Sequence, residues 1–150
     1  MRTLSLLFFS AATAIAADIS GIIKLDGPQP KRPPLQLTPE SRKLYEGRPY
    51  PRDEVELVSA KGEIQNVFVY IRKGLPAEKT YPAPKRPALL DQQRSMFRPR
   101  IQGLFVGQEF AMRNSDPIIH NVRSLSQENR PFNVAQPAGT PDRLKRFSDK

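Results

Sequence analysis

The sequence contains no cysteine, no tryptophan and a single histidine, His120. Without cysteine the chain has no disulfide, no thiol nucleophile and no cysteine-linked lipid anchor. Small exported domains commonly depend on disulfides, so the stability of this one must come from burial of apolar side chains. A lone imidazole is also a sparse basis for metal chemistry, because zinc and copper sites draw on several histidine and cysteine ligands.

The sequence also lacks an apolar run long enough to cross a membrane. Its longest run covers residues 4–17, about 14 residues against the roughly 20 that a spanning helix needs. The run follows a positive start at Arg2 and ends in Ala14-Ile15-Ala16, which is typical of a secretory signal peptide. A buried core helix is the alternative, but no amphipathic pattern follows. We therefore predict a signal peptide at 1–16, a domain at 17–150, no membrane span and a periplasmic or secreted location.

Several catalytic constellations are missing. The chain has only eight glycines and no phosphate-binding glycine loop, and it has no G-x-S-x-G motif to accompany His120 in a serine triad. Its carboxylates are scattered, with no pair spaced as a general acid and base. We predict that the protein is not an enzyme.

Positive charge is abundant, at +9 for the whole chain and +8 once the leader with Arg2 is removed. Basic residues cluster at Lys31-Arg32 and Lys85-Arg86, both flanked by proline, and at 143–146. No recognition helix, zinc spacing or stacking-aromatic signature accompanies them, so nucleic acid is not the expected partner. In an exported protein, this charge favours an anionic envelope component or an acidic protein partner, met through electrostatic steering.

Sixteen prolines and the absence of a long helical repeat indicate an all-β protein. Thr38-Pro39-Glu40 predicts one short helix that ends by Gly47, since it supplies a capping hydroxyl, proline in the first turn and an acid at the positive helix end. Apolar residues on both faces of 64–73 predict a central strand packed on two sides. We predict strands over 17–25, 54–59, 64–73, 89–90, 101–106, 109–113, 118–124 and 132–135, in one β-sandwich with long proline-rich loops.

The segment that could carry chemistry is 106–122, which reads V-G-Q-E-F-A-M-R-N-S-D-P-I-I-H-N-V. It predicts a strand, a polar turn and a second strand that begins near His120. Judged by residue type alone, His120 is a surface or core-edge side chain, because a single imidazole makes a weak metal site.

This pattern resembles the first copper-ligand loop of the cupredoxins, the small blue-copper proteins such as plastocyanin and amicyanin. The resemblance implies a Greek-key sandwich, electron transfer through copper and a redox partner protein. It places His120 at the metal-ligand position and Asn121 at the position that braces the ligand loop, with Asn114 and Asp116 as further supporting residues.

The likeness extends to a group of exported bacterial proteins with cupredoxin-like domains. The matching segments are G-I-I-K-L-D-G-P-Q-P at 21–30, N-V-F-V-Y-I-R-K-G-L at 66–75 and F-N-V-A-Q-P at 132–137. In the segment at 90–100, however, Ser95 stands at the position of the group's cysteine and Arg100 at the position of its histidine. The group's closing C-x-x-H-P-W-M segment, which would supply the other copper ligands, has no counterpart here. A type 1 copper site needs two imidazoles, a thiolate and usually a thioether, so these residues do not complete one.

Two interpretations stay open. In the first, the chain is a C-terminally incomplete cupredoxin-like protein whose full-length form binds copper, and an unpaired sheet edge favours this interpretation. Alternatively, it is a metal-free β-sandwich that binds partners or acts as a structural module. The G-x-I-x-x-x-G-x-x-P opening at 21–30 supports the second interpretation, since it also resembles carboxypeptidase regulatory-like domains.

Overall fold

The structure is a computed structural model that describes residues 20–55 and 57–149; the predicted signal peptide and residues 17–19 lie outside this range. It is rich in β-structure, with six strands in two sheets and one short helix among the described residues. No helix in this part of the chain has the length and hydropathy of a membrane span. The elements are α1 (Pro39–Lys43), β1 (Ala88–Gln93), β2 (Met96–Arg98), β3 (Glu109–Asn114), β4 (His120–Ser124), β5 (Phe132–Gln136) and β6 (Arg143–Arg146).

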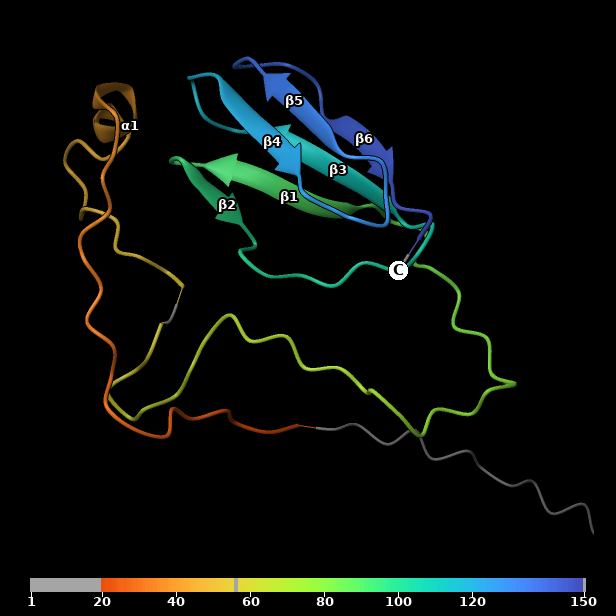
Figure 1. The fold of residues 1–150 in the computed structure, drawn as a ribbon. Coiled ribbons are helices and arrows are strands. Elements are labelled where there is room, and N and C mark those ends of the chain that lie inside the picture. Colours follow the sequence, from red (N-terminus) through yellow and green to blue (C-terminus); the bar gives the residue numbers. More distant parts are fainter. Residues whose placement is uncertain (1–19, 56, 150) are drawn as a thin grey trace, which may run out of the picture.

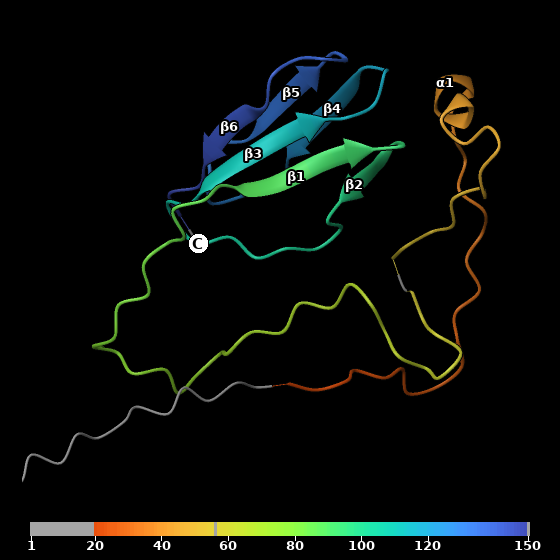
Figure 2. The same cartoon turned by 180° about the vertical axis from the view of Figure 1, so that it is seen from behind.

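The larger sheet has the strand order β2-β1-β3-β6, and the smaller sheet pairs β4 with β5 (Figures 1 and 2). Strand β1 runs parallel to β3, with Leu90 opposite Met112, and every other pairing is antiparallel. The chain passes from β3 to β4 through a short turn and thereby crosses from the larger sheet to the smaller one. The motif of 114–121 therefore lies where the two sheets meet.

The apolar core is small. Phe110, Met112 and Val122 form it, and Met112 is completely buried. Strand β3 contributes three consecutive buried residues because it is central in its sheet and is covered by neighbouring strands. Phe147 packs its ring against Phe110 at a centroid distance of 5.9 Å and extends the core toward β6.

Amide side chains form a second, polar contact between the sheets. Gln136 on β5 has no exposed surface, and its Nε2 donates to the carbonyl oxygen of Met112 on β3 at 2.8 Å. Its Oε1 accepts from Nε2 of Gln92 on β1 at 2.9 Å. Asn114 Nδ2 completes the set by donating to the carbonyl oxygen of Gln136 at 2.8 Å. These groups are buried and cannot bind water. Each hydrogen bond therefore replaces one that the group made with water in the unfolded chain, which avoids the cost of a buried unpaired donor or acceptor.

We predict that Gln136→Leu destabilises the fold by about 1–3 kcal/mol, because the Met112 carbonyl and the Gln92 amide would lose their partners without access to water. The free energy of unfolding in urea measures the effect. Gln127→Leu is the matched control, since Gln127 is exposed. Equal unfolding midpoints for the two variants would contradict the bridging role.

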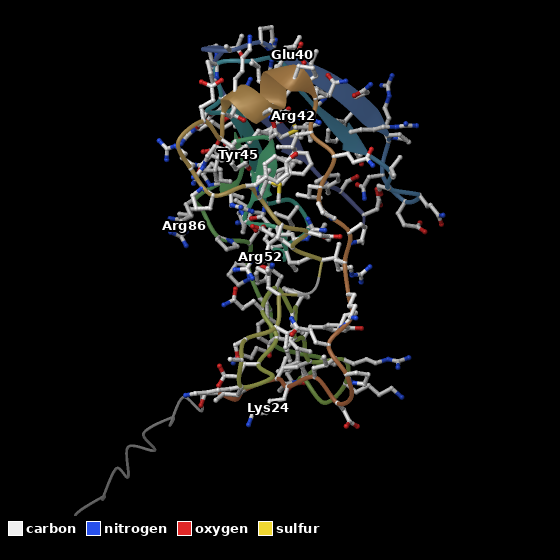
Figure 3. The ribbon with its side chains drawn as sticks, turned by 90° about the vertical axis from the view of Figure 1, so that its left-hand side faces the viewer. Lys24, Glu40, Arg42, Tyr45, Arg52 and Arg86 are labelled. Atoms are coloured by element: carbon white, nitrogen blue, oxygen red, sulfur yellow. The ribbon has the colours of Figure 1, made fainter. Side chains whose placement is uncertain are left out.

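The helix α1 begins as predicted: Thr38 is its N-cap, its Oγ1 accepts from the Ser41 amide at 3.2 Å, and proline follows in the first turn. Apart from α1, the described residues before β1 (20–55 and 57–87) are irregular and extend away from the sheets, with Lys24 near their far end (Figure 3). We call them the N-terminal arm. Two isolated antiparallel bridges, Lys24 with Glu63 and Val58 with Ile64, are the β-pairings of the described N-terminal residues. Within the described parts of the predicted strands over 17–25 and 54–59, the β-structure is thus reduced to the single bridge residues Lys24 and Val58.

The prediction of a central strand at 64–73 is wrong. Apart from the bridge at Ile64, this segment is irregular, and its large apolar side chains are 45–72% exposed from Val67 to Ile71. The alternating pattern is strand-like, but a strand needs a partner, and no described segment pairs with it. Residues 101–106 likewise form no strand.

A surface ion pair holds the β5–β6 connection against β3. Arg113 donates through Nε and Nη2 to the two oxygens of Asp142, at 2.9 and 2.8 Å. The hydrogen bonds from Arg113 lower the pKa of the Asp142 carboxyl below its ordinary value of 3.8, although slight burial opposes the shift. A carboxyl whose pKa is lowered by folding stabilises the native state above its unfolded pKa and loses this contribution as pH falls through its folded pKa.

We expect Asp142→Asn to be less stable than the native chain at neutral pH, and the difference to shrink toward zero on acidification below the ordinary pKa of the carboxyl. Denaturant unfolding at a series of pH values measures this difference. Asp26→Asn serves as the control, because Asp26 is exposed and makes no ion pair with a described residue. A gap that stays constant down to strongly acidic pH would exclude the linkage.

Candidate functional site

The turn between β3 and β4 is organised by Asn114, the last residue of β3, which is only 6% exposed. Its Nδ2 donates to the Ile118 carbonyl at 2.8 Å, and its Oδ1 accepts from the Asp116 amide at 3.0 Å. The Asn114 side chain therefore forms hydrogen bonds with backbone groups of the turn, at the point where the backbone pairing of β3 ends. These bonds fix the direction in which the Asp116 carboxylate points.

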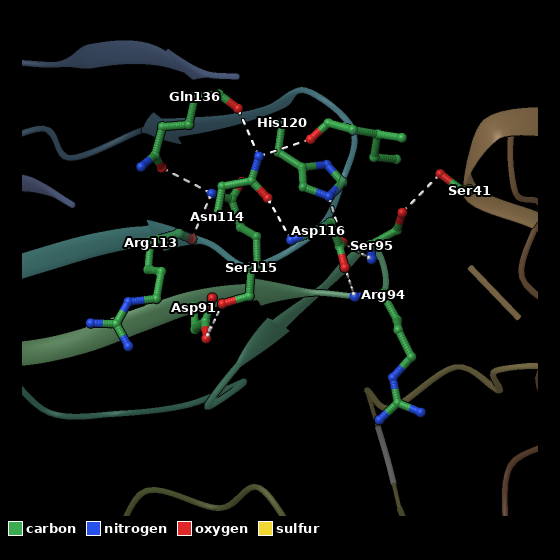
Figure 4. Close-up of polar contacts among 12 residues, drawn as sticks. Ser41, Asp91, Arg94, Ser95, Arg113, Asn114, Ser115, Asp116, His120 and Gln136 are labelled. Carbon is green, nitrogen blue, oxygen red and sulfur yellow. Dashed lines mark hydrogen bonds and ion pairs between the residues drawn. The ribbon is translucent and has the colours of Figure 1, made fainter. Parts of the chain in front are cut away.

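The Asp116 carboxylate is the centre of the site (Figure 4). It is 6% exposed and accepts from the amides of Arg94 and Ser95, at 2.5 and 2.7 Å, and from Nε2 of His120 at 2.7 Å. Arg94 and Ser95 join β1 to β2 with φ values of 53° and 58°, the left-handed pair that a two-residue hairpin turn requires. Neither residue favours this conformation, so the two charge-assisted bonds to Asp116 offset the conformational cost.

The imidazole of His120 is oriented by this carboxylate. A carboxylate oxygen only accepts, so Nε2 carries a hydrogen, and a neutral imidazole in this orientation has its lone pair on Nδ1. No described residue forms a hydrogen bond with Nδ1. The His120 side chain is 15% exposed and lines a small pocket of about 80 Å³ together with Gln92, Ser95, Met96, Phe97 and Asn121.

The N-terminal arm is attached at the same corner. Ser95 Oγ donates to Ser41 Oγ on α1 at 2.8 Å, and Tyr45 Oη donates to the Arg94 carbonyl at 2.6 Å. Partial burial raises the pKa of the Tyr45 phenol, chiefly through desolvation. Since both contacts are made to the turn that Asp116 holds, the seating of α1 depends on this carboxylate.

The structure brings three of the four predicted site residues together: Asn114, Asp116 and His120 are linked through Asp116. The fourth, Asn121, lines the pocket beside His120, but it is exposed and makes no hydrogen bond with a described residue. Arg100 is exposed as well. The part played by the backbone of Arg94 and Ser95 has no sequence signal, because the turn lacks the Asn-Gly or Asp-Gly pair that marks such hairpins.

The donors at this corner do not fit a type 1 copper site. The chain offers one imidazole and no thiolate, whereas such a site takes two imidazoles and a thiolate. Among residues 20–55 and 57–149, no group of three or more His, Cys, Asp or Glu side chains is placed to hold a metal ion. Both oxygens of Asp116 are already engaged by the chain itself.

No protein-family model, curated protein or solved structure matched the chain. The likeness to cupredoxins therefore rests on the motif residues quoted above.

We predict that Asp116→Asn destabilises the protein by about 2–4 kcal/mol, because an amide offers one acceptor oxygen to three donors and directs its own N–H groups at one of them. Urea unfolding measures the loss, and Asp26→Asn is the exposed control. Proteolysis adds a local readout: α1 should be cleaved faster in the variant because its seat on Arg94 and Ser95 loosens. Native stability in Asp116→Asn would mean that the carboxylate is not the organiser of this corner.

Proposed function

We propose that this chain is an exported, cupredoxin-like binding module that holds no type 1 copper centre of its own. The proposal includes the signal peptide at 1–16, the periplasmic or secreted location and a Greek-key arrangement of the two sheets. It treats the protein as a non-enzymatic scaffold that works by binding a partner.

The observation that carries the proposal is the use of the site residues within the fold. Asp116 accepts three hydrogen bonds from its own chain, Asn114 closes the turn and Ser95 binds α1. Thus the serine that stands at the cysteine position of the resembled group has a structural partner in Ser41. The polar side chains where the two sheets meet thus bind other groups of the same chain, which is the role of structural residues in a scaffold.

The test is a copper titration of the purified chain. We expect no intense blue absorption when Cu(II) is added, because that absorption arises from thiolate bound to copper and the chain has no thiol. Mass spectrometry of the exported product should give Ala17 as its first residue. A strong blue band in the monomeric chain would refute the proposal.

Copper binding of another kind is a second candidate. The Asp116–His120 pair is the carboxylate–imidazole arrangement that orients metal-bound histidines, and it leaves Nδ1 without a described partner. Met96 lines the same pocket as His120 and supplies a thioether, a ligand that suits Cu(I). We propose that any copper held here is monovalent and bound by these two side chains.

This candidate predicts that Ag(I), a redox-inert stand-in for Cu(I), binds with an affinity that falls about tenfold in His120→Gln and in Met96→Leu. Isothermal titration calorimetry measures the affinity. Met112→Leu is the control, because Met112 is a completely buried thioether outside the pocket. Unchanged Ag(I) affinity in His120→Gln would contradict monovalent copper binding by His120.

A further inference from the structure

A hollow lies between β5 and β6, on the side of the molecule away from the N-terminal arm. Its volume is about 600 Å³, and residues 129–134 and 145–148 line it. Strands β5 and β6 lie next to each other in both ribbon views (Figures 1 and 2) but belong to different sheets. We call this hollow the β5–β6 groove.

Both walls of the groove are strand edges. Strand β5 pairs only with β4, and β6 pairs only with β3, so each has one edge without a β-partner among the described residues. An unpaired edge presents alternate N–H and C=O groups that an extended peptide can bind. Because β6 is four residues long, it pairs with about four residues of an added strand, and a peptide of about six residues leaves one residue at each end outside the pairing.

The groove is held open at both ends. At one end, the connection from β5 to β6 is fixed by the ion pair of Arg113 with Asp142. At the other, Asn129 Oδ1 accepts from the amides of Ser148 and Asp149, at 2.8 and 3.1 Å. The two edges are therefore fastened without being paired to each other, which lowers the ordering cost of binding.

Cations and aromatic rings line the interior. Phe132 and Phe147 lie 6.3 Å apart between ring centroids, and Lys145 places its Nζ 5.5 Å from the Phe132 centroid. Arg130 adds a second cation, whereas Arg146 is already paired with Glu109 at 3.1 Å, and none of the lining residues carries a carboxylate. Such a surface favours an occupant that alternates acidic and apolar side chains, since successive residues of a strand point to opposite sides.

We propose that the β5–β6 groove binds an acidic, extended segment of a partner protein, which adds a strand to the free edge of β6. The segment places carboxylates against Lys145 and Arg130 and apolar side chains on Phe132 and Phe147. A second copy of this chain is a poor occupant, because two molecules that each carry +8 after removal of the leader repel each other. The inference rests on the proposed binding role of the chain but not on metal binding by His120. The peptide and copper experiments can therefore fail separately.

The test uses a capped, fluorescent peptide of about six residues that alternates glutamate and valine, titrated with the exported chain and followed by anisotropy. We expect saturable binding that weakens with salt. Lys145→Glu should weaken it about tenfold, because a cation at the centre of the groove becomes a like charge. Lys31→Glu carries the same charge change on an exposed, distant lysine and should have little effect.

Two further probes separate strand addition from simple charge attraction. The same peptide with every backbone amide methylated keeps its charge but has no N–H donor on either edge, so it cannot pair with β6 and its binding should be lost. Heparin tests an anionic polysaccharide instead. Equal binding of the methylated peptide, equal effects of Lys145→Glu and Lys31→Glu, or heparin binding that depends on Lys145 while the peptide does not bind would each overturn the proposal.

Discussion

The carboxylate of Asp116 is the interaction on which the arrangement of this protein depends. It is buried where the two sheets and the N-terminal arm meet, and it accepts from two backbone amides and one imidazole. Those amides belong to Arg94 and Ser95, whose left-handed backbone closes the β1–β2 hairpin without glycine or asparagine. The same turn carries the contacts to Ser41 and Tyr45. One carboxyl group thus stabilises a turn, orients a histidine ring and positions a helix.

Such dependence on polar bonds follows from the scarcity of apolar burial. Only four described hydrophobic residues are buried, whereas seven polar or charged residues are, including Gln92, Asn114 and Gln136. A core of this size stabilises weakly, and with no cysteine there is no disulfide to reinforce it. Buried amides compensate only when every donor and acceptor is matched, and the links among Gln136, Gln92, Asn114 and Met112 supply that matching. The directional geometry of these bonds also fixes one register between the sheets, which a few apolar contacts would leave loose.

Local patterns predicted the elements whose information is local. Alternation and turn residues indicated β3, β4, β5 and part of β1, and the capping chemistry of Thr38 gave the start of α1. The prediction at 64–73 was wrong because pairing with another strand is a non-local event that alternation does not report. Strand β2 was missed because its turn lacks the usual signal, and β6 because Arg-Leu-Lys-Arg reads as a charge cluster. At the site, the motif did bring Asn114, Asp116 and His120 together, but the backbone donors of Arg94 and Ser95 leave no trace in residue type.

The basic residues of β6 also have a physical role at the free edge of the sheet. Charged side chains, lysine above all, are a common protection of sheet edges, because the edges of identical chains then repel one another. On β6, Arg143, Lys145 and Arg146 give this protection against copies of the same chain, while the backbone edge itself stays free. A device that repels like charge attracts the opposite charge, so protection against self-association and selection of an acidic strand are the same electrostatic property. The rings of Phe132 and Phe147 behind Lys145 pack against the core and, because they are only half-buried, also present an apolar surface in the groove. For this reason, we regard the groove and not the histidine corner as the part of the surface shaped for a partner.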